Sequence, residues 1–346
     1  MAYTEIDDPS KFFQCTLFTG NGGTQTITNG GNSDLQPDWL WLKKRSASVN
    51  HFLFDSIRGA SKEINSNNTE AEASPSNYLA SFNSDGFSIG SDSDINGNND
   101  TLVAWQWKAG TAFSNDASST SVGSIDSVGS VNTDAGFSIV SFTGGGANAT
   151  IKHGLTSKPS MIIVKARGQA STWSVYHASL GATKFLRLEG NNAVGTEAGW
   201  WNNTEPTSSV FSIGTNHYAN TQIAYCFSEK QGYSKFGSYI GNGNADGTFV
   251  YLGFKPAWLL VKSTATNDWI LHDTKRSPHN VSNVTLFPNG SDADVTNTIY
   301  NQDILSNGFK ARTTHARLNG SGVSYIYMAF AENPFVTSTG VPATAR

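Results

Sequence analysis

The sequence is poor in charged residues, and this scarcity is the first limit on what the chain can be. Asp, Glu, Lys and Arg make up 14% of its 346 residues, against about 25% in an average soluble domain. The net charge is −4, and the longest basic run is Lys43-Lys44-Arg45. A surface that follows nucleic-acid phosphates needs clustered cations. We therefore expect no nucleic-acid partner.

Cysteine and long apolar segments are equally scarce. The two cysteines, Cys15 and Cys226, lie in dissimilar contexts, so they cannot form a disulfide framework and we favour free thiols. No apolar run approaches the roughly 20 residues that cross a bilayer, and the N-terminus lacks the pattern of a signal peptide. We expect a soluble protein that is made in the cytoplasm and does not insert into membranes.

Aromatic and small polar residues supply what the charges do not. The chain has 9 Trp, 11 Tyr, 20 Phe and 34 Gly, so much of its burial must come from large rings. Its polar surface consists mainly of Asn, Ser, Thr and Gly, which favour turns and strands over helices. The composition therefore predicts an all-β protein.

A pattern of Pro, an apolar strand and Lys occurs three times. It spans 37–43 (PDWLWLK), 159–165 (PSMIIVK) and 256–262 (PAWLLVK). Because Trp41, Ile163 and Leu260 occupy the same place in this pattern, we predict that all three are core residues. Four further landmarks accompany each copy: an aromatic-x-Gly-x-Gly turn (18–22, 142–146, 239–243), a polar strand end (Asp55, His177, His272), a central Phe (Phe87, Phe211, Phe309) and a late aromatic residue (Trp105, Tyr225, Tyr327).

The spacing of these landmarks predicts tandem repeats. The Pro and the later Phe are 50, 52 and 53 residues apart in the three copies, and such regularity indicates one repeated structural unit. Short strands separated by turns suit a sandwich. We predict three antiparallel, jelly-roll-like β-sandwich repeats at 12–108, 135–229 and 233–335, with an N-terminal arm (1–11), a Ser/Gly-rich linker or surface arm (109–134) and a C-terminal tail (336–346).

One acidic loop resembles part of a calcium site. Asp92, Asp94, Asn96 and Asp100 place oxygen ligands at near-alternate positions around a glycine, as Ca²⁺ loops do. The twelfth position, counted from Asp92, is Val103 rather than the bidentate Glu of such loops. A polar hairpin loop is the favoured interpretation, and calcium binding is the alternative.

Two adjacent tryptophans, Trp200 and Trp201, are the most conspicuous loop signal. We reason that two neighbouring rings cannot both enter one core from a strand. Exposed rings stack on sugar faces, so a glycan site is one hypothesis. The favoured alternative is a packing contact with another repeat or subunit, or one buried ring beside a partly covered one.

No pattern in the sequence indicates catalysis. Metalloprotease, phosphate-loop and nucleophile-elbow motifs are missing from it, and the Gly-x-Gly turns precede strands rather than helices. The strand-end position varies between Asp55, His177 and His272, so a catalytic group there would occur in one copy only. We predict a non-enzymatic protein without cofactors.

The quoted motifs, together with HFLFDSIRGA (51–60) and FNSDGFSIGS (82–91), make the chain resemble a repeat family of marine bacteriophage virion proteins. The resemblance covers residues from about 3 to 335. It implies a β fold and a structural part of the virion, such as a tail, fibre or head-decoration protein, made in the host cytoplasm. It implies no site residues.

The expected partners follow from this resemblance and from the uncharged strand edges. We expect a homo-oligomer or attachment to other virion proteins, with the arm and the 109–134 tract supplying contacts. A host-surface glycan or receptor-binding module is the alternative function. A polysaccharide depolymerase ranks third, because paired carboxylates are not evident in the sequence.

Overall fold

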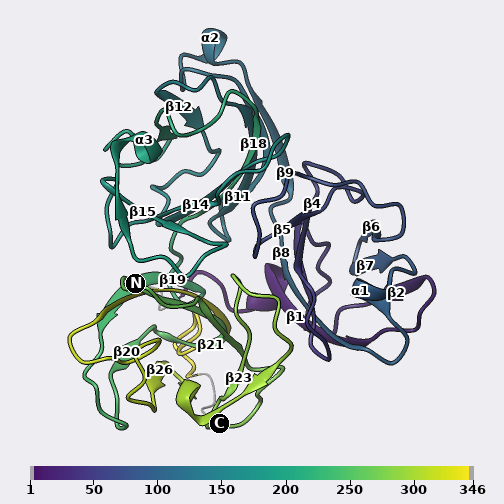
Figure 1. The fold of residues 1–346 in the computed structure, drawn as a ribbon, viewed down its shortest axis with the longest axis vertical. Coiled ribbons are helices and arrows are strands. Elements are labelled where there is room, and N and C mark those ends of the chain that lie inside the picture. The colour runs from purple at the N-terminus through teal and green to yellow at the C-terminus, as the bar shows by residue number, and fades with distance from the viewer. Residues whose placement is uncertain (1–3, 343–346) are drawn as a thin grey trace.

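Strands dominate the computed structural model, which describes residues 4–342 and confirms the predicted all-β class (Figure 1). Helical elements within this range are single turns: η1 (Pro9–Lys11), α1 (Ser93–Asn96), α2 (Ala117–Thr120), α3 (Ala198–Trp201) and η2 (Thr298–Tyr300). No helix among the described residues is long and apolar enough to cross a membrane. Figure 1 shows three lobes around a common centre, which we call the first, middle and third lobes.

The first lobe pairs a large sheet with a small one. The large sheet has the order β1-β8-β3-β4-β5 and the small sheet β2-β7-β6. Their strands are β1 (Phe13–Thr19), β2 (Gln25–Ile27), β3 (Trp39–Lys44), β4 (His51–Asp55), β5 (Ile64–Asn65), β6 (Leu79–Asn83), β7 (Gly86–Ile89) and β8 (Thr101–Trp107).

The middle lobe has a larger main sheet, with the order β16-β15-β14-β13-β18-β11-β10-β9, and a small sheet, β12-β17. Its strands are β9 (Thr111–Asn115), β10 (Ser127–Asn132), β11 (Phe137–Thr143), β12 (Ala149–Lys152), β13 (Met161–Ala166), β14 (Ser174–His177), β15 (Lys184–Arg187), β16 (Gly195–Thr196), β17 (Val210–Ile213) and β18 (Thr221–Phe227).

The third lobe has a main sheet, β19-β27-β21-β22, a small sheet, β20-β26-β25, and the pair β23-β24. Its strands are β19 (Ser234–Ile240), β20 (Phe249–Tyr251), β21 (Phe254–Ser263), β22 (Ile270–Asp273), β23 (Val284–Thr285), β24 (Val295–Thr296), β25 (Gln302–Leu305), β26 (Gly308–Ala311) and β27 (Ser324–Pro334). All ladders in the three lobes are antiparallel.

The Pro-led strands β3, β13 and β21 occupy the same place in the three main sheets. Each lies between the last long strand of its lobe (β8, β18 or β27) and the strand that follows it in sequence (β4, β14 or β22). Pro37 and Pro159 precede their strands, whereas Pro256 lies within β21 where the register with β27 shifts. A bulge tolerates proline because no ladder hydrogen bond is required there.

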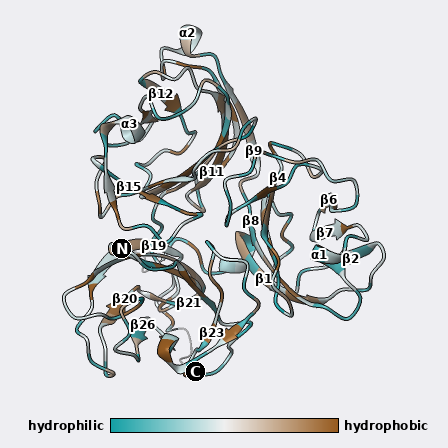
Figure 2. Cartoon of the chain, in the orientation of Figure 1, coloured by the Kyte–Doolittle hydropathy of each residue, from teal (hydrophilic) through white to brown (hydrophobic). Residues whose placement is uncertain are grey.

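Alternation along these strands divides their side chains between two cores. Along β3, Trp39 and Trp41 enter a central cluster, while Leu40 and Leu42 enter the first lobe's own core. Strands β13 and β21 repeat the pattern, with Ile163 and Leu260 in the central cluster. Trp41, Ile163 and Leu260 are at most 1% exposed, which confirms the prediction that they are core residues. Figure 2 shows the hydrophobic segments lying mainly along the strands.

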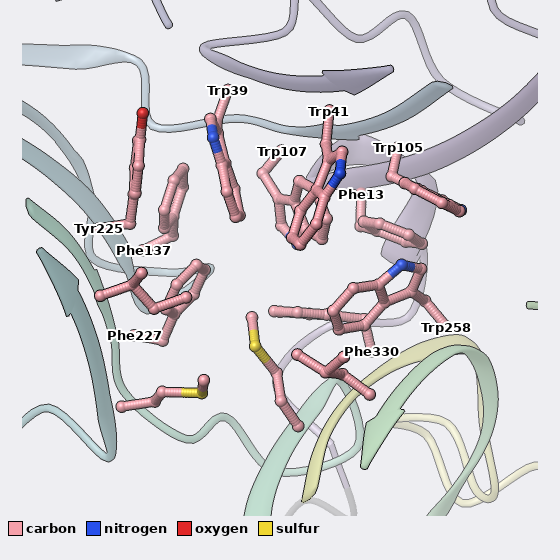
Figure 3. Close-up of a cluster of buried hydrophobic side chains, with 14 of the residues drawn as sticks. Phe13, Trp39, Trp41, Trp105, Trp107, Phe137, Tyr225, Phe227, Trp258 and Phe330 are labelled. Atoms are coloured by element: carbon pink, nitrogen blue, oxygen red, sulfur yellow. The ribbon is translucent and has the colours of Figure 1, made fainter. Parts of the chain in front are cut away.

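The central cluster joins all three lobes, and we call it the shared core (Figure 3). Trp107 of the first lobe lies 5.5 Å from Trp258 and 5.6 Å from Phe330, both of the third lobe. Trp39 stacks on Tyr225 of the middle lobe with ring centroids 4.5 Å apart. Aromatic pairs at such distances contribute beyond the area that they bury. The lobes therefore form one body rather than separate beads.

The 109–134 tract, predicted to be a linker or surface arm, is part of the main sheet of the middle lobe. It connects the first and middle lobes, but β10 pairs with β11 and β9 pairs with β10 over nearly their whole lengths. Phe113 also packs against the core of the middle lobe. The physical reason is that β11 would otherwise be an edge strand with unpaired backbone groups, and the Ser-rich tract satisfies them.

Two of the predicted equivalences are wrong by one residue. Asp55 pairs with Trp39 and His177 with Met161, so their counterpart opposite Trp258 is Asp273 rather than His272. Trp105 and Tyr225 likewise correspond to Met328, not Tyr327. A shift of one residue exchanges the two faces of a strand, and His272 and Tyr327 accordingly face away from the shared core.

The N-terminal arm packs against the lobes over its described part, residues 4–11, with Thr4, Ile6 and Pro9 buried and Glu5, Asp7 and Lys11 exposed. The Thr4 hydroxyl donates to the Gln231 carbonyl at 3.0 Å, and Ile6 joins the shared core. Asp7 accepts a hydrogen bond from the Ser338 backbone at 2.7 Å, so the arm also meets the C-terminal tail. Residues 1–3 of the predicted arm and 343–346 of the predicted tail lie outside the described residues.

Candidate functional site

Both candidate tryptophans are buried, which overturns their interpretation as an exposed glycan platform. Trp200 is 9% and Trp201 1% exposed. They lie on the helical turn α3, not on a strand, so both rings can enter the core of the middle lobe. The rings flank His217, each with its centroid 5.6 Å from the imidazole. They also do not contact another repeat, because their neighbours belong to the same lobe.

The acidic loop does not bring its candidate ligands together. Asp92 caps α1 by accepting from the Asp94 backbone, and Asp94 lies in that turn. The Asn96 amide is buried and donates to the carbonyls of Gly23 and Gly90. Asp100 pairs instead with Lys44 at 2.8 Å.

These contacts leave the four side chains directed at different partners. Among residues 4–342, no cluster of three or more His, Cys, Asp or Glu side chains is placed to hold a metal ion. The polar loop therefore positions the neighbouring Gly-x-Gly turn: Gly22 donates to the Asn96 carbonyl at 2.8 Å.

The buried histidines are neutral structural groups. Burial lowers the pKa of His153, His177, His217 and His272 to about 4. Each ring pairs with a neutral group: a carbonyl for His153 and His177, the Gln222 amide for His217, and the Thr285 hydroxyl for His272. None of these rings pairs with a carboxylate, as the base of a nucleophilic triad does.

Most of the buried charge lies where the lobes meet. Asp55 of the first lobe accepts from the guanidinium of Arg58 and from the Tyr225 hydroxyl of the middle lobe, the latter at 2.7 Å. Asp55 and Arg58 side chains are both fully buried. Burial alone would lower the pKa of Arg58, but Asp55, Tyr225 and Glu72 together outweigh burial and raise that pKa. The pair is thus held against the middle lobe by its contacts with Tyr225.

The third lobe repeats this arrangement against the first lobe. Asp273 accepts from Arg276 and from the Trp105 indole nitrogen, the latter at 3.1 Å. Arg276 lies over the Trp105 ring, 5.6 Å from its centroid, where a cation is attracted by the ring face. The middle lobe has His177 at the same position, and its Nε2 lies 3.2 Å from the Tyr327 carbonyl of the third lobe.

A second set of contacts repeats at all three lobe interfaces. The backbone N–H groups of Glu72, Val194 and Asp294 donate to the carbonyls of Arg167, Thr264 and Arg45 at 2.8, 2.9 and 2.9 Å. Each acceptor lies two residues beyond the Lys of a Pro-led strand. Ion pairs reinforce two of the three contacts, Arg167–Glu72 and Arg45–Asp294, both at 2.7 Å.

The lysines of the Pro-led strands are buried at the same junctions. Burial lowers the pKa of Lys43, Lys165 and Lys262 to about 8. Lys165 donates to the Thr69 carbonyl of the first lobe at 2.9 Å, and Lys43 to the Ser291 carbonyl of the third lobe at 3.2 Å. Lys262 donates to carbonyls of its own lobe. Each of the three lysines thus donates to backbone carbonyls near the end of a strand that contributes to the shared core.

A cleft of about 710 Å³ lies along β1, between the first and third lobes. Gln14 and Thr16 line it on one side, and Lys255, Lys275 and Glu332 line it on the other. Glu332 is its single acidic residue and pairs with Lys255 at 2.9 Å. Cys15, a buried cysteine that forms no disulfide, also lines the cleft. Cys226 is likewise a free thiol and is buried in the core of the middle lobe.

Comparison with protein families identifies the family of this chain. A family model described as a domain of unknown function (DUF7483) matches residues 8–334. The chain belongs to that family. The match includes all three lobes. No curated protein and no solved structure matches the chain.

Proposed function

We propose that this DUF7483 protein is a non-enzymatic structural component of a bacteriophage particle. In this proposal it consists of three tandem β-sandwich repeats of jelly-roll type, packed around a pseudo-threefold axis, and it acts through protein–protein assembly as a homo-oligomer or with other virion proteins. Tail, fibre and capsid surface are the places in the particle that fit this role.

The repeated interface contacts are the observation that most directly supports the proposal. Equivalent positions make the same backbone hydrogen bond at all three interfaces, from Glu72, Val194 and Asp294. Symmetric association of one unit repeats its contacts in this way. Here one chain contains all three copies, which raises their effective concentration for one another.

The use of the buried polar groups supports a structural role. The Asp55–Arg58 and Asp273–Arg276 pairs fix one lobe to the next. Such buried pairs are costly to desolvate and most useful where they specify one arrangement of the parts. The resemblance of the Pro-led motifs to bacteriophage virion repeats then indicates the kind of particle.

The alternative functions have less support. Glycan stacking on Trp200 and Trp201 would require rings that are exposed, and both are buried. A polysaccharide depolymerase commonly uses two carboxylates on either side of the scissile bond. The cleft along β1 offers only Glu332, already paired with Lys255.

Quantitative mass spectrometry of purified particles from the phage that encodes this chain tests the proposal. We expect a fixed, multiple copy number per particle that survives washing in high salt. A non-structural phage protein from the same lysate, followed through the same gradient fractions, is the control. If this chain is no more enriched in the particle fraction than that control, the proposed function is wrong.

A further inference from the structure

The small sheet of the third lobe has an unusual outer face. Its inner face packs on the lobe's own core through Val250 of β20 and Phe309 of β26. By alternation, the residues on either side of them point outward. Phe249 is 45% and Tyr251 54% exposed, and register places Leu305 beyond Gly308 in the same row as Tyr251. We call Phe249, Tyr251 and Leu305 the aromatic face.

The first lobe has polar residues at the same register positions. Thr28, two residues after Thr26, takes the place of Tyr251. Thr26 lies opposite Ser88 and Asn83 opposite Gly86, so these two residues take the places of Phe249 and Leu305. Their side chains are satisfied locally, since the Thr26 and Ser88 hydroxyls lie 2.9 Å apart and Asn83 donates to Ser88 at 2.9 Å. The same sheet in the same fold therefore does not require outward aromatic residues.

The middle lobe differs again, because its own chain covers the edge of the equivalent strand. Thr150 of β12, the counterpart of Phe249, exchanges hydrogen bonds with Ser124 of the 109–134 tract, and the Lys152 carbonyl accepts one from the Ser127 hydroxyl. No such tract exists in the third lobe among the described residues, and Phe249 makes no hydrogen bond outside its sheet.

We propose that the aromatic face is a homotypic docking surface, occupied by the aromatic face of a second copy of this chain across a two-fold axis. An apolar centre with a polar rim is the usual anatomy of a protein interface. An isologous contact brings each patch against itself, so both the centre and the rim must be self-complementary.

Four of the five charged groups named around the face form a neutral network that meets this requirement, and Lys235 is the fifth. Asp246 accepts from Lys310 and from Arg312, each at 2.7 Å, and Asp303 lies 3.4 Å from Arg312. Two acidic and two basic groups give this network no net charge, so two copies of it can meet without like-charge repulsion. Lys235 lies over one side of the Tyr251 ring, 5.5 Å from its centroid.

The size of the face determines the strength expected. Three apolar side chains per copy form a small centre compared with those of obligate dimers. We therefore expect a reversible dimer that forms as concentration rises. This inference rests on the homo-oligomer of the proposed function and names its contact surface. Purified protein tests the surface without any phage particle, so its failure would leave the virion role to be judged by the particle experiment.

Sedimentation velocity over a wide concentration range is the test. The disrupting variant is Phe249→Thr/Tyr251→Thr/Leu305→Asn, which copies polar residues of the kind that the first lobe uses in this sheet. The matched control is Leu17→Thr/Val128→Thr, which removes two other exposed apolar side chains. A single variant, Tyr251→Lys, copies the middle lobe's Lys152 and keeps the test available if the triple variant does not fold.

The expected result is a wild-type protein whose mean mass rises toward that of a dimer. The control should behave like the wild type. The triple variant and Tyr251→Lys should remain monomeric at the concentrations at which the wild type dimerises, with unchanged melting temperature. A wild-type protein that stays monomeric overturns the proposal. So does a dimer that survives in the folded disrupting variants, or one that the control substitutions abolish equally.

Discussion

Two neighbouring leucines on β21 allow the coupling between the lobes to be measured. Leu260 enters the shared core and Leu259 the third lobe's own core, and each is 1% exposed. Replacing a buried Leu with Ala costs about 3–5 kcal/mol, from lost transfer free energy and the cavity left behind. Residue type, burial and strand are the same, so only the core differs.

The two variants should therefore lose similar stability but in different places. Leu260→Ala weakens a cluster to which all three lobes contribute, so it should raise local opening in β3, β13 and β21 together. Leu259→Ala should raise it in the third lobe alone. Hydrogen exchange followed by mass spectrometry reports opening segment by segment, and urea unfolding gives the total loss.

One result would refute this reasoning. If Leu260→Ala increases exchange only within the third lobe, with the same pattern as Leu259→Ala, the shared core does not couple the lobes. An unfolding free energy unchanged in both variants would contradict the burial itself, because neither cavity would then cost anything.

Three further predictions follow from the interfaces and the insertion. Tyr225→Phe removes the hydroxyl that donates to Asp55 and should cost about 1.5–3 kcal/mol in urea unfolding, the range for hydrogen bonds to charged groups; no measurable loss would mean that Asp55 is satisfied without it. The free energy of unfolding should fall as pH drops from about 6.5 toward 4, because histidines bind protons in this range in the unfolded chain, whereas the buried histidines, with a pKa of about 4, stay neutral in the folded protein. His177→Gln should reduce the dependence of melting temperature on pH, and an unchanged dependence would mean that His177 does not contribute to it. Deleting 111–132 exposes the edge of β11 and should lower the melting temperature and promote aggregation, whereas a deletion variant as stable and soluble as the wild type would show that the added strands are dispensable.

The sequence was sufficient to predict the all-β class and the buried Pro-led strands. Apolar residues fill β3, β13 and β21 on both faces, and such continuous runs belong to strands covered on both sides. A continuous apolar run does not specify which side chains of the strand enter the shared core and which enter the core of their own lobe. Trp41 and Leu42 are both apolar, and only the structure assigns the first to the shared core and the second to the first lobe.

The errors at the candidate sites have two physical sources. Landmark spacing matches His272 to Asp55 because spacing locates a strand only to within a residue, whereas face assignment needs the exact register. The hypothesis of an exposed glycan site at Trp200 and Trp201 assumes that both lie on a strand, from which two adjacent rings cannot enter one core. A single helical turn, α3, separates neighbouring side chains by about 100° rather than 180°, and a four-residue helix leaves little signal in a sequence.

The hydrogen bond between Asp7 and Ser338 joins the arm that precedes the first lobe to the tail that follows the third lobe. We call the boundary between these two lobes, which are not consecutive in the chain, the seam of the three-lobed body (Figure 1). Lobe-to-lobe contacts at Arg45–Asp294 cross that seam without a peptide bond, whereas the other two junctions are covalent as well. Cutting the chain at 228–233 and joining it near Asp7 and Ser338 would move the seam while every lobe kept its neighbours. A pull applied at Asp7 and Ser338 would act first on the hydrogen bond between them and then on the contacts across the seam, such as Arg45–Asp294.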